Sequence, residues 1–325
     1  MTRRTRFFLV GAALILAVGL GTGLVAYYKG DFQLFRSTVG PAELAYVPPD
    51  ATGLAYANVR SIMDSEFRQK LQEVLPTGEG KEEFFNQTGI DIERDIQSVL
   101  AAAVGPAARP EQGLLLIRGY FDEGRIEAMI RQHNGSVEDY KGHRLMLMPE
   151  RVGPGPSLTF VETGLALFGS EALVKRAIDT HESAQNVTAN TELMTLVGQV
   201  EGAGNTAWAV GGLEAVTNHP GLPPQVRDQL PGIEWMAVSA RINGGLDGRL
   251  FAQARDDQAA TDLRAVVNGA LAAARLMGGQ DRRFDPVLNS VQVTGVGRDV
   301  DLTFHVPTQV LDMIGDARRS AATPQ

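Results

Sequence analysis

The sequence predicts an α+β fold with two similar subdomains of mainly antiparallel sheet and helices on one face, preceded by a single N-terminal transmembrane helix. Three observations predict it. Segments that suit strands come in pairs, each pair runs into an amphipathic helix that begins at an acidic residue, and this order occurs twice along the chain. With 325 residues, 44% of them hydrophobic, the chain can bury a sizeable core.

The N-terminal segment is predicted to be a membrane anchor. Residues 7–28 carry no charge and span about 33 Å as a helix at about 1.5 Å per residue. Because three arginines precede this segment, we expect residues 1–6 to be a cytoplasmic basic tip and the C-terminal domain to lie in the periplasm, outside a bacterial inner membrane. The alternative is a signal peptide that is cleaved to give a secreted protein. Gly19 and Gly23 have the spacing of a helix dimerisation face, which would give a homodimer, although small residues are also common in membrane spans.

Residues 29–50 are predicted to be a stalk, because Pro48-Pro49-Asp50 disfavours helix and the segment lacks the period of a helix or a strand. The first half of the folded part then opens with a strand at 54–59. A helix is predicted after Asp64-Ser65-Glu66, which is a helix-capping signal. The other expected features are Phe67, Leu71, Val74 and Leu75 on one face of that helix; strands at 96–104 and 114–121; a helix capped by Asp122 with Ile126, Met129 and Ile130 inward; a hairpin at 158–161 and 165–168; and a helix from Ser170.

The second half repeats this order of elements. Its final strand alternates between apolar and mostly polar side chains, so one face of the sheet is predicted to be exposed to solvent. The residues expected to point inward are Val300, Leu302, Phe304 and Val306, and those expected to point outward are Asp299, Asp301, Thr303 and His305. The other expected features are a strand at 206–210; a strand pair at 233–242 and 246–254 joined by a turn at Asn243-Gly244-Gly245; a helix capped by Asp256 or Asp257 with Ala260, Leu263, Val267, Ala270 and Ala274 inward; a hairpin at 291–296 and 299–306; and a helix from Pro307.

The expected domain organisation follows from this order. Identity between the halves is low, so the duplication is a hypothesis about the order of elements. A helix at 190–200 is the candidate boundary. The expected segments are 1–6, cytoplasmic tip; 7–28, transmembrane anchor; 29–50, stalk; 51–185, first α+β subdomain; 186–204, connecting helix and boundary; 205–317, second α+β subdomain; and 318–325, tail.

Composition excludes several kinds of site. The chain has no cysteine, so it holds no thiol nucleophile, no cysteine-ligated metal and no lipidated cysteine. Without the three arginines of the tip, the chain carries 27 basic and 38 acidic side chains, a net charge of −11. Because phosphate binding needs a basic patch, nucleic acid is not expected as a partner.

Motifs that specify a reaction are missing, and the sequence nominates no catalytic, cofactor-binding or metal-binding residue and no cofactor. Asp91, Glu93 and Asp95 resemble the start of a calcium loop, but its sixth position is Ile96 and its twelfth is Ala102, so a turn or single helical turn before the next strand is favoured. The five histidines are scattered: His133 and His181 near helix ends, where they can cap, His143 and His305 on strands, and His219 in a loop.

Several short segments resemble a known group of proteins. They are Pro48-Pro49-Asp50-Ala51-Thr52, Gly89-Ile90-Asp91 with Arg94-Asp95, Arg118-Gly119-Tyr120-Phe121-Asp122, and the stretch from Leu167 to Leu173. Together they resemble uncharacterised bacterial membrane-anchored envelope proteins of a domain-of-unknown-function family, many of them acidobacterial. The resemblance covers residues 46–180 well and the remainder loosely. It implies an exported, membrane-attached location and supplies no catalytic residues.

Three functions remain open from the sequence. The first is a non-catalytic, single-pass membrane-anchored envelope protein whose extracytoplasmic domain binds a protein, glycan or lipid partner through the open face of its sheets. The second is a carrier or chaperone for an apolar ligand. The third is a hydrolase whose carboxylates meet only in the fold. The anchor, the acidic body and the missing reaction motifs favour the first.

Overall fold

The computed structural model describes residues 40–69, 85, 89–105, 113–149, 155–201, 204–212, 232–278 and 285–310. The predicted tip, anchor and tail, most of the predicted stalk, and the residues Gly19, Gly23 and His219 lie outside the described residues. Within the described part of the chain, no helix has the length and apolar character needed to span a bilayer.

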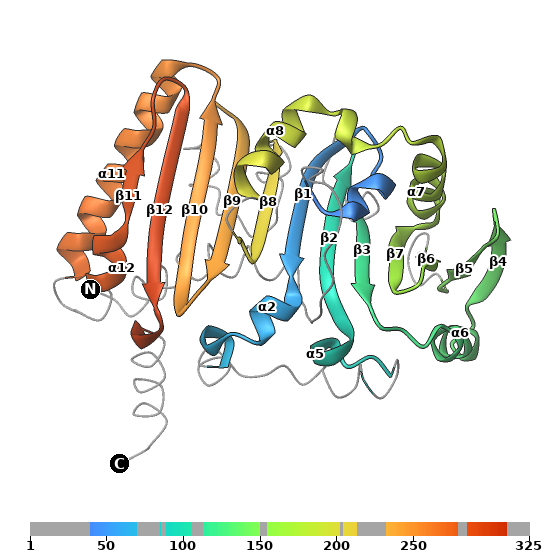
Figure 1. Ribbon diagram of the computed structural model, residues 1–325. Coiled ribbons are helices and arrows are strands. Elements are labelled where there is room, and N and C mark those ends of the chain that lie inside the picture. The colour runs from blue at the N-terminus through green and yellow to red at the C-terminus, as the bar shows by residue number, and fades with distance from the viewer. Residues whose placement is uncertain are drawn as a thin grey trace, which may run out of the picture.

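The described strands form one 12-stranded sheet in which neighbouring strands run antiparallel, and helices pack on it (Figure 1). This confirms the α+β class and the large antiparallel sheet. The strand order is β11-β12-β10-β9-β8-β1-β2-β3-β7-β6-β5-β4. The strands are β1 (Ala51–Asn58), β2 (Ile96–Val104), β3 (Gly113–Gly119), β4 (Ser136–Tyr140), β5 (His143–Leu147), β6 (Pro156–Glu162), β7 (Leu165–Ser170), β8 (Ala207–Gly212), β9 (Ile233–Ile242), β10 (Gly245–Ala254), β11 (Gln292–Thr294) and β12 (Asp299–Pro307).

Helices connect the strands, and their N-terminal caps follow the sequence signals. Oδ1 of Asp122 accepts a hydrogen bond from the backbone N of Arg125 (2.9 Å), and Oδ1 of Asp256 accepts one from that of Ala259 (2.7 Å). The helices are η1 (Ala42–Tyr46), α2 (Val59–Met63), α5 (Ile92–Asp95), α6 (Glu123–Gln132), α7 (Glu171–Ser183), η3 (Val187–Ala189), α8 (Thr191–Val200), α11 (Asp257–Gly278) and α12 (Asp285–Ser290).

The two halves of the sheet have the same strand order. From the centre outward, the first half runs β1-β2-β3-β7-β6 and the second runs β8-β9-β10-β12-β11. The halves meet where β1 pairs with β8, with Ala55 opposite Ala209. Strands β4 and β5 extend the first half only. The boundary between the two expected subdomains stays a prediction, but one hydrophobic cluster contains residues of both halves, including Leu100 and Phe251.

Helices cover both faces of the sheet, so the prediction of helices on one face is wrong. Leu116 of β3 and Trp208 of β8 point to the face covered by η1, α7 and α8, which we call the front face. Val99 of β2 packs on the opposite, back face with α2, and Val300 of β12 packs there with α11. The physical reason is that most strands carry apolar residues at both alternating positions, so each face needs a cover.

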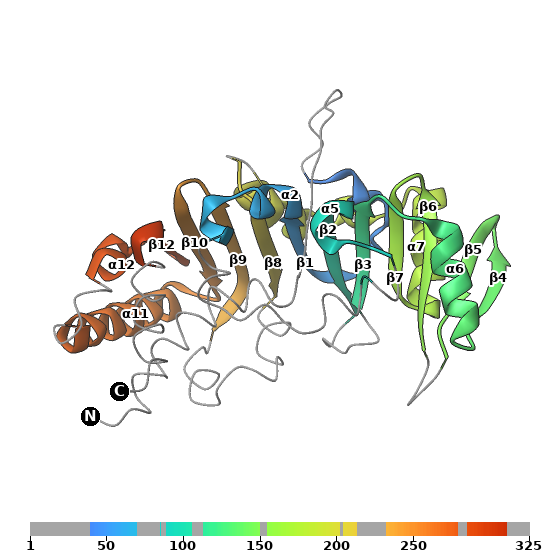
Figure 2. The same cartoon turned by 90° about the horizontal axis from the view of Figure 1, so that it is seen from below.

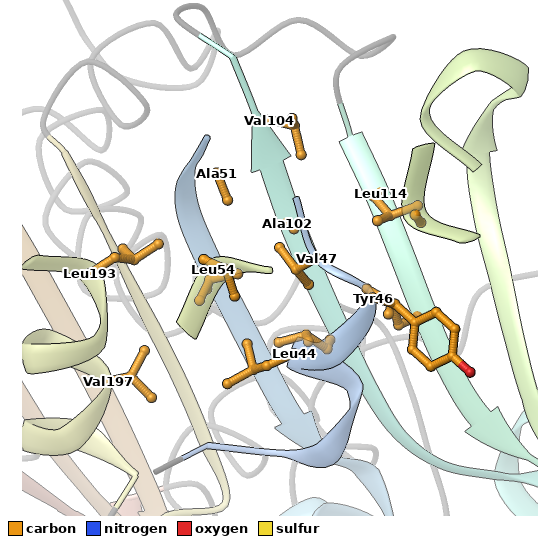
Figure 3. Close-up of a cluster of buried hydrophobic side chains, with 14 of the residues drawn as sticks. Leu44, Tyr46, Val47, Ala51, Leu54, Ala102, Val104, Leu114, Leu193 and Val197 are labelled. Carbon is orange, nitrogen blue, oxygen red and sulfur yellow. The ribbon is translucent and has the colours of Figure 1, made fainter. Parts of the chain in front are cut away.

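The folded core begins before residue 50, which corrects the C-terminal end of the expected stalk. Leu44, Tyr46 and Val47 of and beside η1 are buried, and Figure 3 shows them lying over β1, β2 and β3. Figure 3 also shows Leu193 and Val197 of α8 reaching the same core. The prolines after η1 therefore end a short buried helical segment.

The second half is covered less completely than predicted. Of the five residues expected to face inward on α11, only Ala260 is fully buried, and Ala270 is exposed whereas Leu271 takes its inward place. Over a long helix the 3.6-residue period favours position 271 after position 267. On β12 the predicted alternation is present, but only Val300 of the inward residues is fully buried.

Candidate functional site

The four histidines within the described part of the chain do not gather into a site. Nδ1 of His133 lies 2.8 Å from the backbone O of Met129 at the end of α6, which agrees with a capping role. The ring of His181 instead stacks on Tyr46 with 4.1 Å between ring centroids. His143 and His305 lie on strands, as predicted.

The segment that resembles a calcium loop is a single helical turn. Asp91 caps α5, and its Oδ1 accepts a hydrogen bond from the backbone N of Glu93 (2.9 Å). The carboxylate of Asp95 accepts one from the backbone N of Asp91 (2.7 Å). Two of the acidic side chains are therefore engaged with the backbone. Among the described residues, no group of three or more acidic or histidine side chains is arranged to hold a metal ion.

A partly buried ionic cluster lies on the front face at the end of β3. Nε of Arg118 bonds Oε1 of Glu43, which is 5% exposed, and Nη2 of Arg118 lies 3.6 Å from Oε2 of Glu162. The hydroxyl of Tyr46 donates a hydrogen bond to Oε1 of Glu162 (3.0 Å). We call Arg118, Glu43, Glu162 and Tyr46 the arginine cluster. Sequence reasoning missed it because its members are far apart in the chain and only the fold brings them together.

The electrostatics of the arginine cluster indicate a structural role. Burial raises the pKa of Tyr46, and Glu162 raises it further. Burial lowers the pKa of Arg118, but the hydrogen bond and charge of Glu43 outweigh this, so its pKa lies above the ordinary value. The guanidinium therefore stays charged between two carboxylates, and the tyrosine stays protonated at neutral pH. Each group is engaged with another, so the cluster offers no free nucleophile or base.

An open groove of about 540 Å³ runs along α7, and charged side chains line much of it. Lys141 bonds the carboxylates of Asp179 (2.5 Å) and Glu182 (2.7 Å), and Arg176 bonds both carboxylate oxygens of Asp50. The hydrogen bond to Asp179, followed by that to Glu182, raises the pKa of Lys141. Lys141 and Arg176 are thus both paired with carboxylates, so the groove does not offer an unpaired positive charge to bind an anion.

The front face of β9, β10 and β12 has a different character. Figure 1 shows α8 in front of β8 and no described helix in front of β10 and β12. The outward residues predicted for β12 lie on this face, beside partners on β10. We call this surface the open face; it consists of Arg241, Asp247, Arg249, Asp301, Thr303 and His305.

Cross-strand ion pairs organise the open face. Nε of Arg249 lies 3.0 Å from Oδ1 and 2.9 Å from Oδ2 of Asp301, and this hydrogen bonding raises the pKa of Arg249. Nδ1 of His305 lies 2.8 Å from Oδ1 of Asp247, and Nη2 of Arg241 lies 3.7 Å from Oδ2 of the same carboxylate. The face is therefore a pre-arranged set of hydrogen-bonding groups with both signs of charge.

The pairing of His305 with Asp247 does not form a catalytic triad with the serine beside it. Oγ of Ser290 accepts a hydrogen bond from the backbone N of His305 (2.9 Å) and donates one to its backbone O (3.0 Å). This hydroxyl is thus engaged with the backbone of β12. A triad would need the hydroxyl to bond the imidazole ring.

Neither a protein-family model nor a curated protein matches the chain. Among solved structures, the chain is similar to crystal form I of TP0453, with 11% sequence identity and a TM-score of 0.46. That match covers 87% of this chain and 99% of the TP0453 chain.

Proposed function

We propose that the chain is a non-catalytic, single-pass membrane-anchored envelope protein whose periplasmic domain binds a protein partner through the open face. The observation that carries this proposal is the contrast along the front of the sheet. Helices cover the front of the first half, whereas the front of β10 and β12 presents paired charged groups to solvent. The anchor predicted at residues 7–28 supports the membrane location, and the resemblance to bacterial envelope proteins supports the compartment.

The chemistry of the open face favours a protein partner. Arginine and aromatic side chains are enriched at protein interfaces, and the open face has two arginines with Trp235 beside it on the same side of β9. Because the ion pairs are already formed, few side chains would need to be ordered on binding. A lipid surface would instead call for an apolar or strongly basic face.

The two alternatives have less support. A carrier for an apolar ligand needs an enclosed apolar cavity, and the groove along α7 is open and lined by charged groups. A hydrolase needs a carboxylate or hydroxyl free to react, and Glu43 and Glu162 are both held by Arg118.

The proposal is tested by blocking the open face in the full anchored chain. Thr303→Trp adds bulk at the centre of the open face, and Thr163→Trp adds the same bulk at the exposed turn between β6 and β7 as a control. After cross-linking in cells and purification of the membrane fraction, we expect the specific partner to be lost with Thr303→Trp and retained with the control. Equal recovery with both variants, or no specific partner in repeated experiments, would overturn the proposal.

The membrane orientation is tested separately. A reporter fused after Gln325 that is active only in the periplasm should be active in cells that express the full chain. Activity of a cytoplasmic reporter at the same position would reverse the proposed orientation.

A further inference from the structure

The chain contains three Asn-Gly pairs, and the fold places them in three different surroundings. Asn243-Gly244 lies in the turn between β9 and β10, Asn134-Gly135 leads from α6 into β4, and Asn268-Gly269 lies within α11. Figure 2 shows β9 and β10 in one half of the sheet, and α6 with β4 at the far end of the other half. All three asparagine side chains are exposed, so the pairs differ mainly in the surroundings of the glycine nitrogen.

An Asn-Gly pair can rearrange covalently when the backbone nitrogen of the glycine reaches the side-chain carbonyl carbon of the asparagine. The nitrogen gives its proton to a base and bonds Cγ, while the side-chain nitrogen gains a proton and leaves as ammonia. Water then adds to one of the two carbonyl carbons of the resulting succinimide ring, which opens to aspartate or isoaspartate. Glycine favours this reaction because it has no Cβ atom to hinder the approach.

The end of α6 holds the nitrogen of Gly135 in place. Asn134 adopts the left-handed conformation, with φ 64°, and the N–H of Gly135 donates a hydrogen bond to the backbone O of Ile130 (2.8 Å). This bond closes a common type of helix end. A Cβ atom at Gly135 would overlap Ile130 and lie 2.6 Å from the backbone O of Leu147, so the backbone has little room to turn. We therefore expect Asn134 to be protected from the reaction.

Helix α11 holds the nitrogen of Gly269 in a different way. Asn268-Gly269 lies in the interior of this 22-residue helix. In such a helix the N–H of Gly269 donates to the carbonyl four residues earlier, which belongs to Ala265. The helical dihedral angles would have to change before the nitrogen could reach the asparagine side chain. Asn268 is therefore expected to react only when this part of the helix opens.

The turn between β9 and β10 leaves the nitrogen of Gly244 accessible. Gly244 is exposed with φ 65°, and a Cβ atom there would meet no atom within 4 Å. Within the described part of the chain, no group accepts a hydrogen bond from its N–H. The backbone N of Asn243 donates to the backbone O of Gly245 (3.1 Å), which leaves the bond between Asn243 and Gly244 at the tip of the turn. The Gly244 nitrogen can thus turn toward the Asn243 side chain without breaking a hydrogen bond.

We infer that Asn243 is a site of spontaneous covalent modification, at which the chain converts to aspartate and isoaspartate while Asn134 and Asn268 remain asparagine. The conversion places a new carboxylate two residues after Arg241, whose guanidinium lies 3.7 Å from the carboxylate of Asp247. Isoaspartate also lengthens the backbone of the turn by one atom, at a position where the structure is open. The inference rests on the turn alone and does not depend on the proposed partner.

The test compares the rates of conversion at the three asparagines in one sample. The full chain in detergent is incubated at mildly alkaline pH and digested with trypsin, and mass spectrometry measures the replacement of the side-chain NH2 by OH. We expect Asn243 to convert at least about tenfold faster than either Asn134 or Asn268. Equal rates at the three sites would overturn the inference. Trypsin releases the asparagines in three separate peptides, which span residues 242–249, 132–141 and 265–275.

The same chain unfolded in urea is the control for local sequence. We expect the three rates to become similar in urea, because the hydrogen bonds that distinguish the sites are lost there. If Asn243 keeps its lead in urea, its neighbours in the sequence cause the difference, and the structural explanation is wrong. Asn243→Gln requires a larger ring for the same reaction, so it should remove the product from the peptide 242–249 and leave the rate at Asn134 unchanged. Product that persists in that peptide would contradict the assignment to Asn243.

Discussion

The two halves of the sheet share a strand order but differ in how completely they are covered. Strand β3 and its neighbour β7 bury Leu116 and Leu167 fully beneath the front helices. In the second half, Leu302 and Phe304 of β12 remain only half-buried although they face the helix side. A shared topology therefore does not imply a shared distribution of stability. The first half is expected to carry most of the folding free energy, and the second half to present its surfaces to partners.

The largest expected difference concerns matched leucines. Leu167→Ala removes a fully buried side chain and should lower the free energy of unfolding by about 3 kcal/mol, because it leaves a cavity. Leu302→Ala removes the same atoms from a half-buried site and should cost about 1 kcal/mol. Urea denaturation followed by circular dichroism measures both. Equal losses would show that the two halves are equally important for stability.

Ion pairs provide the second comparison. Arg118→Leu leaves the buried carboxylate of Glu43 without its cation and should cost about 2–3 kcal/mol. Arg249→Leu removes a solvent-exposed cation from the open face and should cost less than about 1 kcal/mol. If Arg249→Leu proves the more destabilising of the two, the open face is part of the stabilising framework and not a free surface.

The packing between the two halves, where β1 pairs with β8, should make the free energy of unfolding depend on pH in the alkaline range. Burial, with a contribution from Glu43, raises the pKa of Tyr56 to about 12, and its ring packs against Trp208 with 5.7 Å between centroids. Because the folded state holds this proton more tightly, the stabilisation is present below about pH 10 and is lost as the pH rises through about 12. The loss amounts to about 2 kcal/mol.

Denaturation curves between about pH 9 and 12 test this dependence. We expect Tyr56→Phe to reduce the loss of stability over that range, whereas Tyr120→Phe, which alters an exposed ring, should follow the wild type. If the free energy of unfolding of Tyr56→Phe falls with pH as steeply as that of the wild type, water reaches the junction of β1 and β8.

The smallest expected effect should be the same in both halves. Asp122→Ala and Asp256→Ala each remove a hydrogen bond that caps a helix, and each should cost about 1 kcal/mol. Thermal unfolding of the two variants measures this directly. A clearly smaller cost for Asp256→Ala would show that the start of α11 contributes less to the folded state than the start of α6.

Local signals in the sequence determined much of the secondary structure. The alternation in β12, the capping aspartates of α6 and α11, and the turn at Asn243-Gly244 between β9 and β10 are all present as predicted. These features depend on a few neighbouring residues, so the sequence alone specifies them. The short helix α2 after β1 was not predicted, because it is only five residues long and lacks a repeating apolar pattern.

Features that depend on contacts between residues far apart in the sequence were determined only by the tertiary structure. The pairing of β1 with β8 joins both halves into one sheet, and the arginine cluster brings Glu43 to Arg118 across 75 positions of sequence. The structure also placed helices on both faces and left Val266 and Leu276 of α11 exposed. The hydrophobic periodicity of a helix or strand shows which of its residues share a face. Which other element covers that face depends on how the whole chain packs.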